Sequence, residues 1–197
     1  VYIGGTNFDG REMKDGVISE VILFDKKLSQ NEEYKITYYL SQKWGLDSSV
    51  DSDGDGVMDA DDQYPMDATK SMDVPDLSDS VDAQIGGASG LDSIESNLML
   101  WLDASNIDVS SNATLSDGDA ISEWKDLSGN ENNATQTVAG SKPTFQSSDM
   151  EVYFNDDYMD IPNTPIPIGA TESYTLIAVS RLTEDNSSRG VDGIISS

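Results

Sequence analysis

The sequence predicts a mainly β protein with one short helix, at about residues 30–44, and an irregular acidic linker between its strand-rich parts. Short apolar runs rich in β-branched residues, separated by glycine and polar turns, predict the strands. A capping box followed by apolar residues at helical spacing predicts the helix. Residues 47–97 hold fourteen acidic residues against one basic residue, Lys70. Repulsion among so many carboxylates opposes a regular fold in that segment.

Composition argues against several classes of function. The 197 residues carry a net charge of −26, which repels nucleic acid and anionic membranes. The chain has no cysteine and no histidine, so it lacks disulfides, thiol nucleophiles, thiolate metal sites and the Ser-His-Asp triad. No apolar run is long enough to span a bilayer. We therefore expect no enzyme activity, no nucleic-acid partner and no membrane insertion.

The N-terminal part predicts two strands. Val1–Ile3 is apolar and precedes a glycine turn. Gly16–Phe24 is almost continuously apolar, as in a strand that is buried on both faces. Glu20 interrupts this run, and it is either a hydrogen-bonded structural carboxylate or a functional one.

The single helix has a marked start and end. Ser29 and Glu32 form a capping box, and Gly45 is placed to end the helix. We expect the aromatic residues of this segment to pack against a sheet, and an aromatic platform for a ligand is the alternative: Tyr34, Tyr38, Tyr39 and Trp44.

The C-terminal part predicts a series of strands after a glycine- and serine-containing connector at residues 85–96. Each is a short run with apolar, β-branched or aromatic residues between polar turns. The expected strands are Leu98–Leu102, Ala120–Trp124, Pro143–Phe145, Glu151–Phe154, Tyr158–Ile161, Tyr174–Ser180 and a last one within Gly193–Ser197.

Five aspartates of the linker are spaced for a divalent cation. They stand at i, i+2, i+4, i+8 and i+11, namely Asp51, Asp53, Asp55, Asp59 and Asp62. In a curled loop every second side chain points inward, and Gly56 permits the sharp turn. The carbonyl of Val57 occupies the place of the main-chain ligand in an EF-hand loop, and calcium takes roughly six to eight such oxygens. We predict that these six residues bind Ca²⁺; a solvated acidic linker is the alternative.

Two further cation sites stay open. The acidity continues without the same spacing through Asp67, Asp73, Asp76, Asp79 and Asp82, which could hold a second ion. Asp103, Asp126 and Asn130 could hold another cation near a loop.

The segment Asp51–Asp73 resembles a thrombospondin type 3 repeat. It reads D-x-D-G-D-G-x-x-D-x-x-D and then P-x-D, in one complete copy. Pro65 and the presence of Asp62 in place of the usual glutamate argue against a true EF-hand. The resemblance implies a calcium-wrapped segment of an extracellular protein.

Both flanks resemble bacterial laminin G-like, concanavalin A-like modules. Gly16–Asp25, Leu28-Ser29 and Tyr39–Leu46 resemble the C-terminal end of such a module, and the words LWLDAS and WKDLSGN resemble its opening. The resemblance implies antiparallel jelly-roll β-sandwich portions. Residues 1–46 would be the C-terminal part of one module, 47–97 the calcium linker and connector, and 98–197 the N-terminal part of a second.

These observations lead us to expect part of a longer extracellular or cell-surface repeat protein of bacterial type. Its role would be structural, adhesive or filament-like assembly, with neighbouring modules or copies of the same protein as partners. The alternative is a lectin-like carbohydrate-binding module, accessory to an enzyme elsewhere, with Trp44, Trp101 and Trp124 stacking on sugars.

Neither flank is long enough to bury a complete core alone, so 1–46 and 98–197 should not fold separately. The partner strands are expected from other parts of the protein, from a neighbouring copy, or from pairing of the two flanks.

Overall fold

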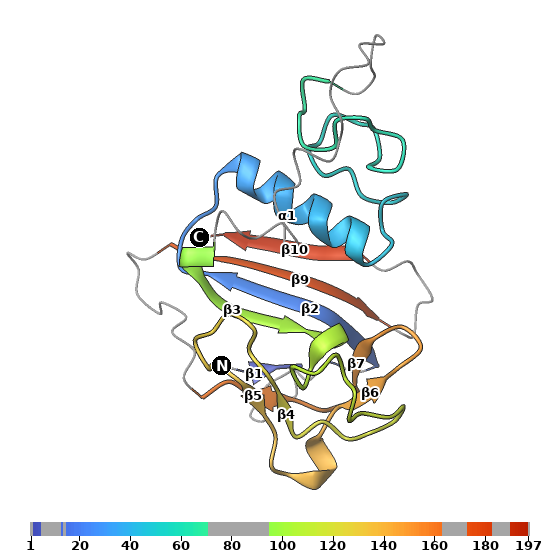
Figure 1. Ribbon diagram of the computed structural model, residues 1–197, viewed down its shortest axis with the longest axis vertical. Helices are drawn as coiled ribbons and strands as arrows, with labels where there is room; N and C mark the ends of the chain where they lie inside the picture. The colour runs from blue at the N-terminus through green and yellow to red at the C-terminus, as the bar shows by residue number, and fades with distance from the viewer. Residues whose placement is uncertain are drawn as a thin grey trace. The chain divides into compact units, whose positions relative to one another are not determined.

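The computed structural model describes residues 2–4, 13, 15–70, 95–162, 173–182 and 190–196. The chain divides into two compact units, one of residues 1–27 and 98–197 and one of residues 28–97. The described residues form two antiparallel sheets and one α-helix (Figure 1). The predicted mainly β class with one short helix is therefore confirmed. Two sheets are compatible with a β-sandwich, and the jelly-roll order stays a prediction.

The unit of residues 28–97 contains helix α1, Gln30–Lys43. The backbone N–H of Ser29 donates to the Glu32 carboxylate at 2.8 Å, as the capping box predicts. The Ser29 hydroxyl also donates to this carboxylate at 2.8 Å. The helix ends at Lys43 with Trp44 as its C-cap, and Gly45 follows with a φ of 64° that favours glycine. A 3-10 helix, η2 (Glu95–Asn97), is the last described part of this unit.

The other unit contains both sheets. The larger sheet has the order β10-β9-β2-β7-β6, and β3 also pairs with β2. Its strands are β2 (Gly16–Phe24), β3 (Leu98–Asp103), β6 (Thr144–Gln146), β7 (Glu151–Phe154), β9 (Thr175–Leu182) and β10 (Gly190–Ser196). The smaller sheet has the order β1-β8-β5-β4. Its strands are β1 (Tyr2–Ile3), β4 (Glu123–Trp124), β5 (Ala134–Thr135) and β8 (Met159–Asp160).

Strand β2 lies at the centre of the larger sheet, between β9 and β3 (Figure 1). It pairs antiparallel with β9 from Gly16 to Phe24. Along its other edge it pairs first with β7 and then with β3. All nine of its residues are buried, as the nearly continuous apolar run predicted. Of the three expected sources of partner strands, the structure shows the third, because the two flanks of the linker pair with each other.

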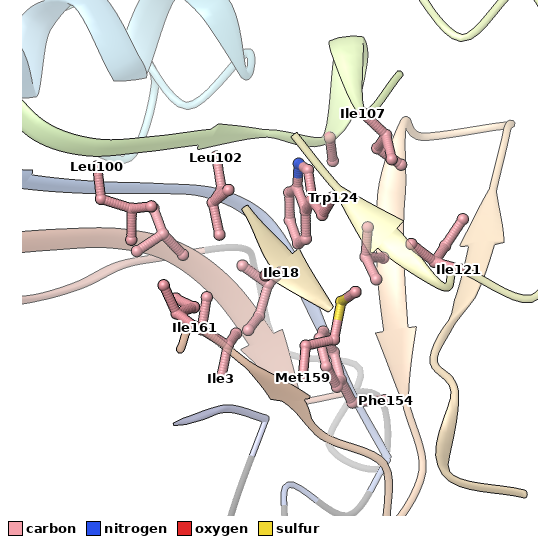
Figure 2. Packing of buried hydrophobic residues seen from close by; sticks show 14 of the residues in the cluster. Ile3, Ile18, Leu100, Leu102, Ile107, Ile121, Trp124, Phe154, Met159 and Ile161 are labelled. Atoms are coloured by element: carbon pink, nitrogen blue, oxygen red, sulfur yellow. The ribbon is translucent and has the colours of Figure 1, made fainter. Parts of the chain in front are cut away.

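The core of this unit lies between the two sheets. Side chains from β2, β3, β6 and β7 meet side chains from β1, β4, β5 and β8 in one buried cluster. Figure 2 shows Trp124 among Ile18, Leu102 and Met159. The Trp124 ring is fully buried, and its indole N–H donates to the carbonyl of Asp103 at 3.2 Å. The larger and the smaller sheet therefore share one apolar core.

The expected strand Ala120–Trp124 is wrong in extent. Ala120 forms an isolated bridge with Thr144 of the larger sheet, whereas Trp124 belongs to the smaller sheet. The segment crosses from one sheet to the other, so it cannot form one continuous strand.

Candidate metal centre

The acidic loop is attached to the C-terminal end of α1 by main-chain hydrogen bonds. The N–H of Leu46 donates to the carbonyl of Ser41 at 2.7 Å, which turns the chain back after the helix. The N–H of Asp59 then donates to Val50 O at 2.8 Å, and this bond closes the loop of residues 50–59. Helix and loop therefore belong to one locally folded segment, although the sequence placed them in different modules.

Three of the predicted ligands come together inside this loop. Asp51, Asp53 and Asp55 each offer a carboxylate oxygen, and these oxygens lie within 4.8 Å of one another. Two ligands on opposite sides of one calcium ion are separated by about 4.8 Å, twice the usual calcium–oxygen distance. In the part of the chain that the structure describes, this is the one group of acidic side chains with such geometry.

Backbone amides of the loop hold the carboxylates in place. The two oxygens of Asp51 accept from Gly54 N at 2.7 Å and Gly56 N at 2.9 Å. Both glycines have positive φ values, 78° and 97°, which residues with a Cβ rarely adopt. Asp55 accepts from Val57 N at 2.9 Å. A carboxylate oxygen has two lone pairs, so each keeps capacity for a cation.

One oxygen of the group has no partner among the residues that the structure describes. Asp53 is only 4% exposed, and its Oδ1 accepts from Asp55 N at 3.2 Å. Its Oδ2 is fully buried and accepts no hydrogen bond from the described residues. A buried carboxylate oxygen without a donor is costly unless a cation neutralises it. A cation at this position would give the oxygen the partner that it lacks among the described residues.

The electrostatic environment points the same way. Burial raises the pKa of Asp53, and repulsion from Asp55, Asp62 and Asp51 raises it further, against one opposing backbone hydrogen bond. Burial likewise raises the pKa of Asp62, with repulsion from Asp55, Asp59 and Asp51 adding to it. The negative form of these side chains is disfavoured without a positive partner. A divalent cation would reverse this balance.

The other three predicted ligands are placed differently. Asp59 is buried, and its oxygens accept from Ser52 N at 2.8 Å, from the Ser52 hydroxyl at 2.7 Å and from the Ser41 hydroxyl. Asp59 therefore ties the loop to α1, a role that the spacing did not reveal. Asp62 accepts from Tyr64 N at 2.7 Å and lies outside the group of three. The N–H of Val57 is bonded to Asp55, and its carbonyl stays a predicted ligand.

The second possible ion in the linker falls mostly outside the described residues, since these end at residue 70 and resume at residue 95. Asp73, Asp76, Asp79 and Asp82 lie in that interval. Asp67 is described, and it accepts from the Thr69 hydroxyl at 2.6 Å and forms an ion pair with Lys70 at 3.2 Å. These contacts lower the pKa of Asp67.

The residues proposed for another cation near Asp126 serve a structural role. The Asp126 carboxylate accepts from Trp101 N and Ser128 N, both at 2.9 Å, and from Asn132 N at 3.0 Å. The Asn130 side chain donates to Leu98 O at 2.8 Å. This loop thus satisfies polar groups along the edge of β3 that β2 does not use. Asp103 accepts from Ser105 N at 2.8 Å and starts the 3-10 helix η3 (Ala104–Asn106).

The three tryptophans and Glu20 are buried or half-buried. The indole of half-buried Trp101 donates to Glu20 Oε1 at 2.7 Å, and Glu20 is 1% exposed. These contacts favour the structural interpretation of Glu20. Trp44 is also buried, with the Lys43 ammonium 5.2 Å from its ring. Trp124 is a core residue.

No family model, no curated protein and no solved structure matches this chain. None of the helices in the described ranges combines the length and the apolar character that a bilayer crossing requires.

Proposed function

We propose that residues 51–62 bind one calcium ion and that this ion stiffens a segment of an extracellular multidomain protein with a structural, adhesive or assembly role. The observation that carries the proposal is the buried Oδ2 of Asp53, which has no partner among the described residues and lies in a group of three aspartates. Carboxylate oxygens suit hard cations, and the absence of cysteine and histidine leaves no softer ligands.

Asp51, Asp53 and Asp55 would supply the first carboxylate ligands. Asp62 lies close enough to raise the pKa of Asp53 by repulsion, and with the carbonyl of Val57 it would complete the set. Asp59 would instead hold the loop against Ser41 of α1. Binding would then order the loop and the end of the helix together, because both share the Asp59 contacts.

The alternative of a carbohydrate-binding module requires a row of exposed aromatic side chains on one sheet face. Among the described aromatic residues, Tyr2 is the one that is exposed, with 38% of its surface accessible. Its ring packs edge to face against Tyr158, with the ring centroids 5.6 Å apart. A structural role is therefore the better proposal. Binding on a glycan array that persists after substitution of the three aspartates would favour the alternative.

Calcium titration followed by limited proteolysis tests the proposal. Saturating calcium should protect the bonds of residues 51–67 from cleavage, and a chelator should restore cleavage. Magnesium at the same concentration serves as the control, since it demands a tighter octahedral geometry than this flexible set of oxygens offers. Cleavage that is indifferent to calcium would contradict the proposal.

A further inference from the structure

The larger sheet depends on one strand to hold its parts together. Among the described strands, β9 and β10 pair with each other, and β6 pairs with β7. Of the strands that the structure describes, β2 alone joins these pairs to each other and to β3. Without β2 the sheet would separate into three pieces, with a strand-wide groove between β9 on one side and β3 and β7 on the other.

The groove is fitted to the side chains of β2 on both faces. Ile18, Val21 and Leu23 enter the core between the two sheets. Val17 and Ile22 are also completely buried. Main-chain pairing extends over the whole strand on the β9 edge. Strand β2 therefore supplies both hydrogen bonds and apolar contacts that the remaining strands need.

The connection from β2 to its neighbour β3 is very long for an antiparallel pair. Phe24 lies opposite Leu98, yet residues 25–97 separate them, including the whole unit that carries α1 and the acidic loop. A tight hairpin turn would keep a strand beside its own neighbour. Even short flexible linkers give effective concentrations only of millimolar order, and longer connections give lower ones, so this connection holds β2 beside β3 less closely than a tight turn would. A strand from another molecule can make the same contacts and compete at such concentrations.

We infer that β2 is an exchangeable strand, and that a second copy of this chain inserts its Gly16–Phe24 between β9 and the β3–β7 edge. The inference rests on the assembly role proposed above and names both the partner and the surface. It uses none of the aspartates of the acidic loop, so the two proposals can fail separately.

Mixed refolding of two single-cysteine chains tests the exchange. The chain has no cysteine of its own, and Ile18 lies opposite Val152 in the pairing of β2 with β7. Equal amounts of Ile18→Cys and Val152→Cys chains are refolded together from denaturant in an oxidising glutathione buffer. A disulfide-linked dimer of the two different chains forms when the β2 of one lies in the sheet of the other. Its yield should rise at least about tenfold between roughly 10 μM and 1 mM protein.

Two controls make the result decisive. Ile18→Cys refolded with Val138→Cys measures accidental linkage, because Val138 is 55% exposed and pairs with no strand. One chain with both Ile18→Cys and Val152→Cys should form an internal disulfide at 10 μM (about a hundredfold below the expected crossover). A yield equal to the Val138 background at every concentration would overturn the exchange, and failure of the internal disulfide would overturn the placement of β2 itself. Each mixture is refolded once with calcium and once with a chelator. Disulfide linkage under both conditions would support strand exchange even if the loop binds no calcium.

Discussion

Replacement of Asp53 by asparagine should have opposite effects with and without calcium. Asparagine keeps the shape of the side chain and removes its charge. In the chelated protein, the change removes a buried negative oxygen that has no donor and that Asp51 and Asp55 repel. In the calcium-bound protein, it removes the negative charge of a ligand and leaves a neutral amide oxygen in its place. The sign of the effect therefore depends on the ion, which a purely structural role of Asp53 would not produce.

The size of the effect follows from the geometry. A unit charge about 2.4 Å from a calcium ion is attracted by roughly 3 kcal/mol even at the dielectric constant of water. This corresponds to a loss of about 100-fold in affinity. Extracellular modules bind calcium at about 10⁻⁴–10⁻³ M, so the Asp53→Asn chain should show almost no binding at millimolar calcium. In chelator it should gain about 1 kcal/mol of stability, because an unpaired charged oxygen is no longer buried.

Isothermal titration with calcium and thermal unfolding in chelator measure the two effects. Asp61→Asn is the matched control, because it removes the same charge from an exposed position just after the loop and outside the group of three. Its calcium affinity should change by less than about threefold. Equal calcium affinities of the two variants would show that Asp53 is not a calcium ligand.

The remaining predictions concern pH and two structural contacts. On acidification, calcium affinity should begin to fall at a pH above the usual range of aspartate pKa values. The raised pKa values of Asp53 and Asp62 let protons compete with the ion, and calcium titrations at several pH values measure this. In chelator, acidification should instead stabilise the folded loop, because protonation is favoured in the folded state. Stability should therefore fall as pH rises through the raised pKa values, and melting temperatures that rise with pH would contradict this. Asp59→Ala should destabilise residues 28–70 by about 2–3 kcal/mol even without calcium, because buried donors lose their acceptor; far-UV circular dichroism should show loss of helix. Arg181→Met should lower the free energy of unfolding in denaturant by about 2–3 kcal/mol. The fully buried Glu151 would lose its 2.7 Å ion pair with Arg181, whose side chain is 25% exposed. A loss below about 0.5 kcal/mol, the value of a surface ion pair, would contradict this prediction.

Local features of the fold could be predicted from the sequence. The capping box places the start of α1 correctly, and the apolar run Gly16–Phe24 coincides with β2. Glu151–Phe154 is likewise the strand β7. These elements are encoded by residues that are neighbours in the chain, through capping and periodicity.

Pairings between distant segments could not be predicted. Nothing in the order of residues indicates that β2 lies between β9 and β3, because any buried apolar strand would satisfy the same pattern. The ion pair of Glu151 with Arg181 joins residues thirty positions apart, and no local sequence motif indicates it. Strand β5 was missed because two residues carry no periodicity.

The candidate site was predicted in part. Alternation correctly brings Asp51, Asp53 and Asp55 together, since neighbouring odd positions of a curled loop share its inner side. The spacing alone could not place Asp59, because its position depends on Ser41, a residue of the preceding helix. A serine near the helix end is too common to have signalled this contact.

A crystal structure of the protein grown in calcium, with anomalous scattering data, would locate the ion. We expect an anomalous peak at about 2.3–2.6 Å from oxygens of Asp51, Asp53 and Asp55, with Oδ2 of Asp53 among the ligands. A calcium-saturated crystal without a peak there, in which Oδ2 of Asp53 accepts a hydrogen bond from the protein, would contradict it.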